Sequence, residues 1–302
     1  MKRKWIITAS TLILIGFIGL LFSGFKINDK ELIEFEHEFE YSGPISLNDL
    51  TILGSSTNVN LTFLESDVTT QIIKIDGKTD IKTIEKIRQA NFIDGHFKLD
   101  LGEEEAFRLL SFGFQESKIN INVFMPKPDK LSQLVFNLKS GNIEINQLAA
   151  KSGLVEVKSG KIQMNNSEVD ELQVKATSGN IKVTEQKGNL AVKIGSGNVS
   201  INQLTGYTSI DSTSGEINVT QHDKQGASIK AKSGNVKFVQ HKASNVDIDV
   251  LSGNVKFEAA NDFAGFYELK TTSGNIDSPD SKRSSQHLIK INTTSGDIKV
   301  TQ

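Results

Sequence analysis

A Ser-Gly pair that recurs every 18 to 22 residues constrains the fold of this 302-residue chain more than any other feature. The successive glycines are separated by 19, 19, 18, 18, 19, 19, 21 and 22 residues. Self-similarity at one short period is typical of a solenoid, in which each repeat forms one coil. The nine pairs begin at Ser140, Ser159, Ser178, Ser196, Ser214, Ser233, Ser252, Ser273 and Ser295.

The residues around each pair alternate between apolar and polar. Two places after every glycine stands Ile or Val, and four places before every serine stands an apolar residue. The position between these columns, three before the serine, is polar or charged in every unit. A period of two indicates β-strands, so each unit reads as a strand, a corner and a second strand. The sequence therefore predicts an all-β protein whose residues 136–302 form a regular parallel β-solenoid of about nine coils, of either hand.

The corner itself has a physical explanation. Glycine permits the backbone angles of a sharp turn, and the residue after it is Asn in six of the nine units. Stacked asparagines can form a hydrogen-bonded ladder between coils. The Ser-Gly motif is therefore predicted to be a structural corner and not a reactive site.

Residues 32–135 are predicted to form an irregular β-rich N-terminal part of the solenoid. The stretch from Ile33 to Tyr41 alternates apolar residues with Glu34, Glu36, Glu38 and Glu40, which indicates a strand with one wet face. A row of glutamates invites a cation site, but a solvated strand face is the favoured interpretation. Further strands follow without a clean repeat.

The N-terminus predicts a membrane anchor. Residues 5–25, Trp5 to Phe25, carry no charge, and 21 residues make about 31 Å of helix, the thickness of a hydrocarbon core. The basic residues at 2–4 place the tail, residues 1–4, in the cytoplasm. We therefore expect a single-pass transmembrane helix, a linker at 26–31, and an extracytoplasmic remainder on the cell membrane. A cleaved signal peptide is the alternative.

Composition narrows the function classes. The net charge of −2 does not favour nucleic acid, and the lack of cysteine excludes thiol nucleophiles and thiolate-bound metals. His222 and His241 lie one repeat apart, with Asp223 as the only nearby third ligand, so exposed turn residues are favoured over a metal site. The polar column three places before each serine mixes lysines with acids and shows no carboxylate cluster. We expect no catalytic residues, no cofactor and no metal.

Two departures from the repeat are candidate contact sites for a ligand or partner. The seventh interval contains Phe263, Phe266 and Tyr267, and exposed aromatics can stack on sugars or anchor a partner. The chain then ends inside a repeat that contains Asp297 and Lys299. An uncapped last coil would offer unpaired backbone groups, so this C-terminal edge is predicted to self-associate or to dock a partner.

The anchor at Trp5 to Phe25, the stretch "INVFMPKPDKLSQLVFNLKSGNIEI" at 121–145 and the repeated Ser-Gly-Asn corners together resemble a known family. It is the "putative adhesin" β-strand-repeat family of bacterial envelope proteins, and in particular its LiaG-like membrane-anchored members from Gram-positive envelope-stress operons. The resemblance implies an extracytoplasmic β-solenoid, a link to the envelope-stress response and no catalytic residues.

We therefore expect a non-enzymatic envelope protein that binds a cell-wall polymer or senses stress with membrane proteins of the stress response. A polysaccharide-active β-solenoid enzyme and a self-associating surface scaffold are the alternatives.

Overall fold

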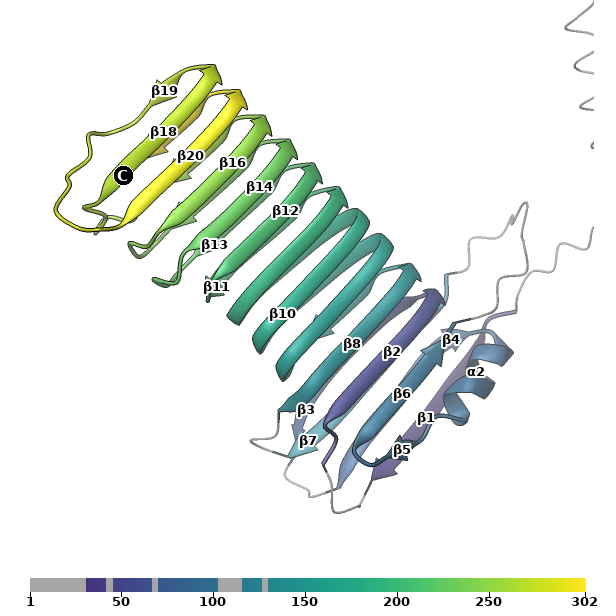
Figure 1. Cartoon of the computed structure of the whole chain (residues 1–302). Coiled ribbons are helices and arrows are strands. Elements are labelled where there is room, and N and C mark those ends of the chain that lie inside the picture. The colour runs from purple at the N-terminus through teal and green to yellow at the C-terminus, as the bar shows by residue number, and fades with distance from the viewer. Residues whose placement is uncertain (1–30, 42–45, 67–69, 103–115, 127–129) are drawn as a thin grey trace, which may run out of the picture. The chain divides into compact units, whose positions relative to one another are not determined.

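The computed structural model describes residues 31–41, 46–66, 70–102, 116–126 and 130–302, and those from Leu32 onward form one compact unit. In this unit the strands stack as successive coils along a rod, as the sequence predicts (Figure 1). No helix within these described ranges is long and apolar enough to cross a membrane. The predicted span at residues 5–25, the tail before it and residues 26–30 of the linker predicted at 26–31 lie outside the described residues.

Two ladders of parallel strands make up the rod. The N-terminal elements are β1 (Ile33–Tyr41), β2 (Asp49–Ser56), β3 (Asn58–Ser66), β4 (Gln71–Thr79), α2 (Ile81–Arg88), β5 (Phe92–Ile93), β6 (His96–Leu101), β7 (Lys118–Pro126), β8 (Leu131–Ser140) and β9 (Ile143–Asn146). The remaining strands are β10 (Ala149–Ser196), β11 (Val199–Thr205), β12 (Thr208–Ser214), β13 (Ile217–Gln221), β14 (Ala227–Ser233), β15 (Val236–Gln240), β16 (Val246–Ser252), β17 (Val255–Glu258), β18 (Phe266–Ser273), β19 (Ile276–Asp277), β20 (Leu288–Ser295) and β21 (Ile298–Thr301).

The front ladder contains β8, β12, β14 and β16, and the back ladder contains β9, β11, β13, β15 and β17. Strand β10 runs through its corners for 48 residues and contributes to both ladders. Equivalent residues of neighbouring coils lie in exact register, for example Ile217 opposite Val236 and Val236 opposite Val255. Neighbouring coils are therefore about 4.8 Å apart.

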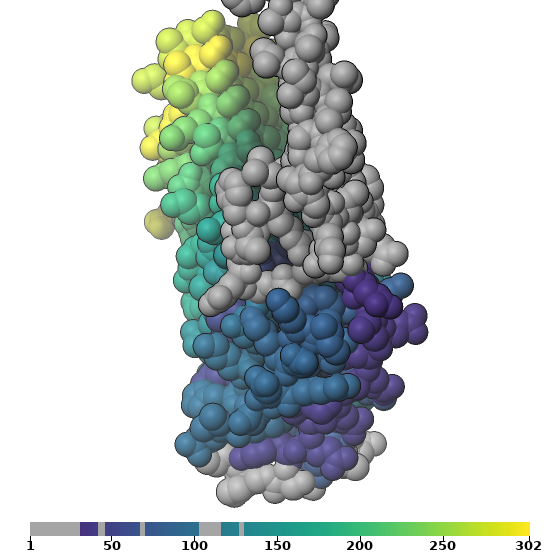
Figure 2. Space-filling model, turned by 90° about the vertical axis from the view of Figure 1, so that its right-hand side faces the viewer, coloured from purple at the N-terminus to yellow at the C-terminus, as the bar shows by residue number. Residues whose placement is uncertain are grey.

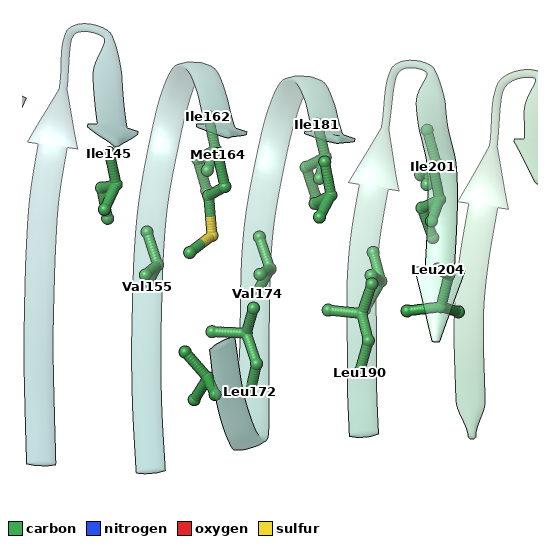
Figure 3. Packing of buried hydrophobic residues seen from close by; sticks show 14 of the residues in the cluster. Ile145, Val155, Ile162, Met164, Leu172, Val174, Ile181, Leu190, Ile201 and Leu204 are labelled. Carbon is green, nitrogen blue, oxygen red and sulfur yellow. The ribbon is translucent and has the colours of Figure 1, made fainter. Parts of the chain in front are cut away.

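The apolar columns form one continuous core between the ladders. Side chains such as Val155, Ile162, Met164 and Val174 point inward and are fully buried (Figure 3). Their partners across the core come from the other ladder of the same or the next coil. Removal of this apolar surface from water is the main stabilising contribution to a rod of this kind.

The Ser-Gly corners need glycine for two reasons. At Gly179 the backbone φ is +134°, a conformation that residues with a side chain rarely adopt. A Cβ atom at this position would also lie 1.7 Å from the carbonyl oxygen of Gly160 in the preceding coil. The corner glycines therefore let successive coils approach each other closely.

The predicted asparagine ladder is confirmed. The backbone N–H of Asn198 donates to Asn180 Oδ1 at 3.0 Å, and the N–H of Glu216 donates to Asn198 Oδ1 at 3.0 Å. The same bond joins Asn254 to Asn235 near the C-terminal end. The side chains of Asn142, Asn180, Asn198, Asn235 and Asn254 thus each accept a hydrogen bond from the next coil.

Coils at both ends are stacked out of sequence order. At the N-terminal end, the coil of β2 and β3 lies between that of β6 and β7 and that of β8 and β9. At the C-terminal end, β20 pairs with both β16 and β18, and β21 pairs with both β17 and β19. The last coil of the chain is therefore second to last in space, and β18 lies beyond β20 (Figure 1).

An antiparallel layer covers the N-terminal end. Strand β4 pairs antiparallel with β7, and β1 pairs antiparallel with β4. Helix α2 begins after Asp80, whose carboxylate accepts from the N–H groups of Lys82 and Thr83, and it buries Ile84 and Ile87. Figure 2 shows residues of this N-terminal layer, in purple and blue, at the opposite end of the rod from the yellow C-terminal residues.

The glutamate row of β1 is solvent-exposed, as the favoured interpretation predicted. All four glutamates lie on the exposed face, while Phe35 and Phe39 pack against the core. Glu36 forms a 2.5 Å ion pair with Lys74 on β4. Within the described residues, no group of three or more His, Cys, Asp or Glu side chains is placed to hold a metal ion.

Candidate functional site

The predicted C-terminal edge is not formed by the last repeat, which corrects the expectation for Asp297 and Lys299. The coil of these two residues has a neighbouring coil on each side. The N–H of Asp297 donates to Asn254 Oδ1 at 2.8 Å, and its own Oδ1 accepts from the N–H of Asn275 at 2.8 Å. Lys299 Nζ lies 3.1 Å from Asp277 Oδ2. Both residues stay on the surface, but the open edge belongs to β18 and β19.

We call the coil of β18 and β19 the open coil. In the described part of the chain, β18 pairs only with β20 and β19 only with β21. Because no coil lies beyond it, its apolar column is partly uncovered. Ile276 is 45% exposed, whereas Ile298, in the same column one coil inward, is 1% exposed.

The three aromatic candidates lie at this end but differ in exposure. Phe263 is only 1% exposed, so the expectation that it offers an exposed ring is wrong. Its ring packs at 5.0 Å from that of Tyr267, and together they fill the end of the core. Phe266 is 40% exposed. A ligand-contact role for Phe266 and Tyr267 remains a prediction.

Tyr267 is held in an apolar setting. Burial raises the pKa of its phenol above the ordinary value. Its hydroxyl oxygen is buried and has no hydrogen-bond partner among the described residues. The Tyr267 N–H donates to Ser281 Oγ at 2.9 Å, so the loop after β19 covers the start of β18.

Three lysines stack on the outer face of the back ladder near this end. Lys237 lies opposite Lys256, and Lys256 lies opposite Lys299, in adjacent coils. We call these three residues the lysine ladder. They line a shallow depression of about 370 Å³ together with Asn235 and Asn254 of the corners and the acidic residues Glu216 and Asp297.

The front ladder carries a different pattern. Here Lys230 lies between Asp211 and Asp249, and Lys290 lies between Asp247 and Glu268. All of these side chains except Asp247 border a wider depression of about 710 Å³ that crosses five coils. Opposite charges directly across strands stabilise each other, so this face compensates its own charge.

His222 and His241 stack on adjacent coils, as their spacing predicts. Their ring centroids are 4.2 Å apart. Burial and the charge of His241 lower the pKa of His222. Asp223 accepts a hydrogen bond from the Gln221 amide, so the one candidate third ligand has a structural role.

Two features were missed at the sequence level, and both had a signal. Four residues after the glycine, the repeat has an apolar residue in eight units but Ser278 in the unit of Gly274. That polar residue marks the coil with an incomplete core, which is the open coil. The signal of the lysine ladder is the recurrence of lysine three places after the glycine, at Lys237, Lys256 and Lys299.

Comparison with a known protein family supports the fold assignment. The sequence profile of the Toastrack DUF4097 family matches residues 48–301. No curated protein matches the chain. A "putative adhesin" of Bacteroides fragilis aligns at 12% identity and a TM-score of 0.41, covering 88% of this chain and 97% of its own. A "putative lipid binding protein" of Parabacteroides distasonis aligns at 15% identity and a TM-score of 0.49, with the same coverage. The family match covers most of the rod, and the chain therefore belongs to the Toastrack DUF4097 family.

Proposed function

We propose that this chain is a non-enzymatic, membrane-anchored module of the bacterial envelope that binds a phosphate-bearing cell-wall polymer through the lysine ladder. The single observation that carries the proposal is the direct stacking of Lys237, Lys256 and Lys299.

Like charges directly opposite each other in neighbouring strands are unfavourable, by roughly 0.2–1 kcal/mol for each pair. Within the described residues Lys237 and Lys256 have no acidic partner, and Lys299 has only Asp277. A phosphate between two lysines about 4.8 Å apart would remove this repulsion and receive charge-assisted hydrogen bonds from both. The arrangement therefore favours an anionic ligand.

The corner asparagines extend the same surface. The Oδ1 atoms of Asn235 and Asn254 are used by the asparagine ladder, which accepts the N–H groups of Asn254 and Asp297. Their amide N–H₂ groups have no hydrogen-bond partner in the described part of the chain and border the depression. They add neutral donors beside the ammonium groups, a combination typical of phosphate binding.

The shape of the site favours a polymer over a small molecule. The depression is shallow and runs along the rod across several coils, whereas small-molecule sites enclose most of their ligand. A linear polymer with regularly spaced phosphates can contact several coils at once, and each contact adds to the affinity.

The proposal also includes the predicted membrane anchor and a role in the bacterial envelope. The predicted span at 5–25 would tether the chain, and the short linker joins it to β1, the strand at the covered end of the rod. Such a tether and the resemblance to LiaG-like members support a role in the envelope-stress response. The polymer-binding surface would then report on the state of the cell wall.

The test is sedimentation of the full chain, in detergent, with purified cell walls that keep or lack their phosphate-bearing polymers. Lys237→Gln with Lys256→Gln should weaken retention about tenfold or more, because each lysine contributes charge-assisted contacts. The matched control, Lys230→Gln with Lys290→Gln, changes the net charge equally but removes lysines that already have acidic neighbours. Its retention should stay close to that of the unchanged protein.

Three results would contradict the proposal. The first is equal retention on walls without the phosphate-bearing polymers, and the second is equal weakening by both double variants. The third is release of soluble sugar, which would instead support the polysaccharide-active enzyme.

A further inference from the structure

We propose that two copies of this chain join end to end, with their open coils paired across a two-fold axis. This inference goes beyond polymer binding and depends on a different surface. It rests on the edge formed by β18 and β19.

The backbone of the open coil can form hydrogen bonds with a further strand. Inside the rod, corner N–H groups donate forward to the next coil, as Gly253 donates to Ser295 O and Gly296 to Ser273 O. In the same way Ile298 donates to Asn275 O at 2.9 Å. Gly274 and Ile276 occupy these positions in the open coil, and their N–H groups have no partner among the described residues. A strand placed beyond β18 and β19 would satisfy them.

The apolar column ends on the same surface. Leu269 and Ile276 are the outermost members of their columns, and neither has a coil above it. One coil inward, Ile291 and Ile298 are fully buried. A second copy would bury this uncovered end of the core as each inner coil buries its neighbour.

The charge of this end permits contact between identical surfaces. Residues 266–287 contain three acids, Glu268, Asp277 and Asp280, and three bases, Lys270, Lys282 and Arg283. The segment is therefore neutral when histidine is neutral, and two copies can meet without net repulsion. A symmetric contact requires this kind of self-complementarity.

The covered end of the rod excludes head-to-tail growth. Its outermost strand in the back ladder is β1, whose exposed face carries four glutamates. Charged residues on an edge strand are a common protection against further pairing. The sequence of β18, "FYELKTTS", has no such row and no proline. The open coils of two copies are therefore the surfaces that can pair. Once they have paired, neither copy offers an open coil to a third chain.

The loop between β19 and β20 leaves most of the edge accessible. Its described hydrogen bonds reach Ala264, Gly265 and Tyr267, next to the start of β18. From Leu269 onward the edge of β18 receives no hydrogen bond from this loop. The pairing surface is therefore the second half of β18 together with β19.

The test measures the mass of the full chain in detergent by light scattering across a dilution series. The unchanged protein should have the mass of two chains and dissociate on dilution. Ile276→Lys puts a charge into the contact and should give the mass of one chain. Leu251→Lys, a control at another exposed aliphatic residue, on the side of β16, should remain a dimer.

Cross-linking identifies the surface independently of any contact made by the membrane span. The chain has no cysteine, so Thr272→Cys introduces a single thiol beside the edge. A short bismaleimide should link two such chains. Thr213→Cys, the equivalent position of β12 in the middle of the rod, should give no product.

Several outcomes would overturn the proposal. They are a monomer at every concentration, a dimer that survives Ile276→Lys, and equal cross-linking of Thr213→Cys and Thr272→Cys. Wall retention measured on Ile276→Lys separates the two proposals, since the lysine ladder remains intact in this variant.

Discussion

Both ends of the rod have coils stacked out of sequence order, but the two ends differ in how the outermost edge is covered. At each end the coil nearest the chain terminus lies inside, between a coil from later or earlier in the sequence and the rest of the rod. Only the N-terminal end then adds an antiparallel layer with a glutamate-rich edge. The difference shows that out-of-order stacking fixes a coil in place, whereas covering the last edge requires a separate structure.

Removing residues 288–302 should have the largest effect on this comparison. The deletion removes four buried aliphatic residues, Ile289, Ile291, Ile298 and Val300, each of which contributes about 1.5–3 kcal/mol by burial. It also removes β20 and β21, the only strands that pair with β18 and β19 in the described part of the chain. Hydrogen exchange should show loss of protection throughout residues 266–277, while β12 and β14 remain protected.

The matched change at the other end is an internal deletion of Ile33–Tyr41. Among the described strands β1 pairs only with β4, so loss of protection should stop at β4 and leave the inner coil of β2 and β3 unchanged. If 266–277 stays protected without residues 288–302, then β18 and β19 do not depend on the last coil.

Substitutions in the asparagine ladder should change the free energy of unfolding by an intermediate amount. Asn198→Ala removes the acceptor for the N–H of Glu216 and should lower the free energy of unfolding by about 1 kcal/mol. Asn275→Ala should change it far less, because the open coil has no next coil to donate to this side chain. Equal losses in denaturant titrations would contradict this difference between inner and outer coils.

The smallest effect concerns Tyr267 in the open coil. Its hydroxyl is buried without a partner, so Tyr267→Phe should leave stability unchanged or raise it by up to about 1 kcal/mol. The pKa of this phenol is raised in the folded protein, so the folded state retains the proton longer than the unfolded state. The resulting stability is present below the ordinary tyrosine value of about 10 and is lost as the pH rises through the higher folded value.

The measurement is hydrogen exchange in residues 266–277 across the alkaline range. Protection should fall with rising pH in the unchanged protein and fall less in Tyr267→Phe. Tyr41→Phe in β1 is the control at the covered end. An identical alkaline loss in all three proteins would show that Tyr267 is not its origin.

Much of the rod was predictable because its local rules repeat. The columns at Ile181 and Val199, the corner glycines and the asparagine ladder follow from alternation and turn chemistry in single units. The N-terminal coil was harder to recognise because Thr57 replaces the corner glycine there. Register nevertheless places Ser56 opposite Ser140, as in a regular unit.

The order of the coils could not be derived from the same rules. Ile276 and Ile298 satisfy one column equally well, so the repeat does not determine which coil lies outside. Only Ser278, in place of an apolar residue, distinguished the two. For the same reason the candidate site was assigned to Asp297 and Lys299 at the chain end, when the open edge belongs to β18 and β19.

Out-of-order stacking at the C-terminal end also has a consequence for folding during synthesis. Residues 266–277 leave the ribosome before residues 288–302, yet their permanent partners are in that later segment. The emerging chain therefore presents the edge of β16 to a coil of similar pattern that does not belong there. Growth of this rod cannot finish in the order in which its residues appear, and the last fifteen residues decide whether the end is assembled correctly.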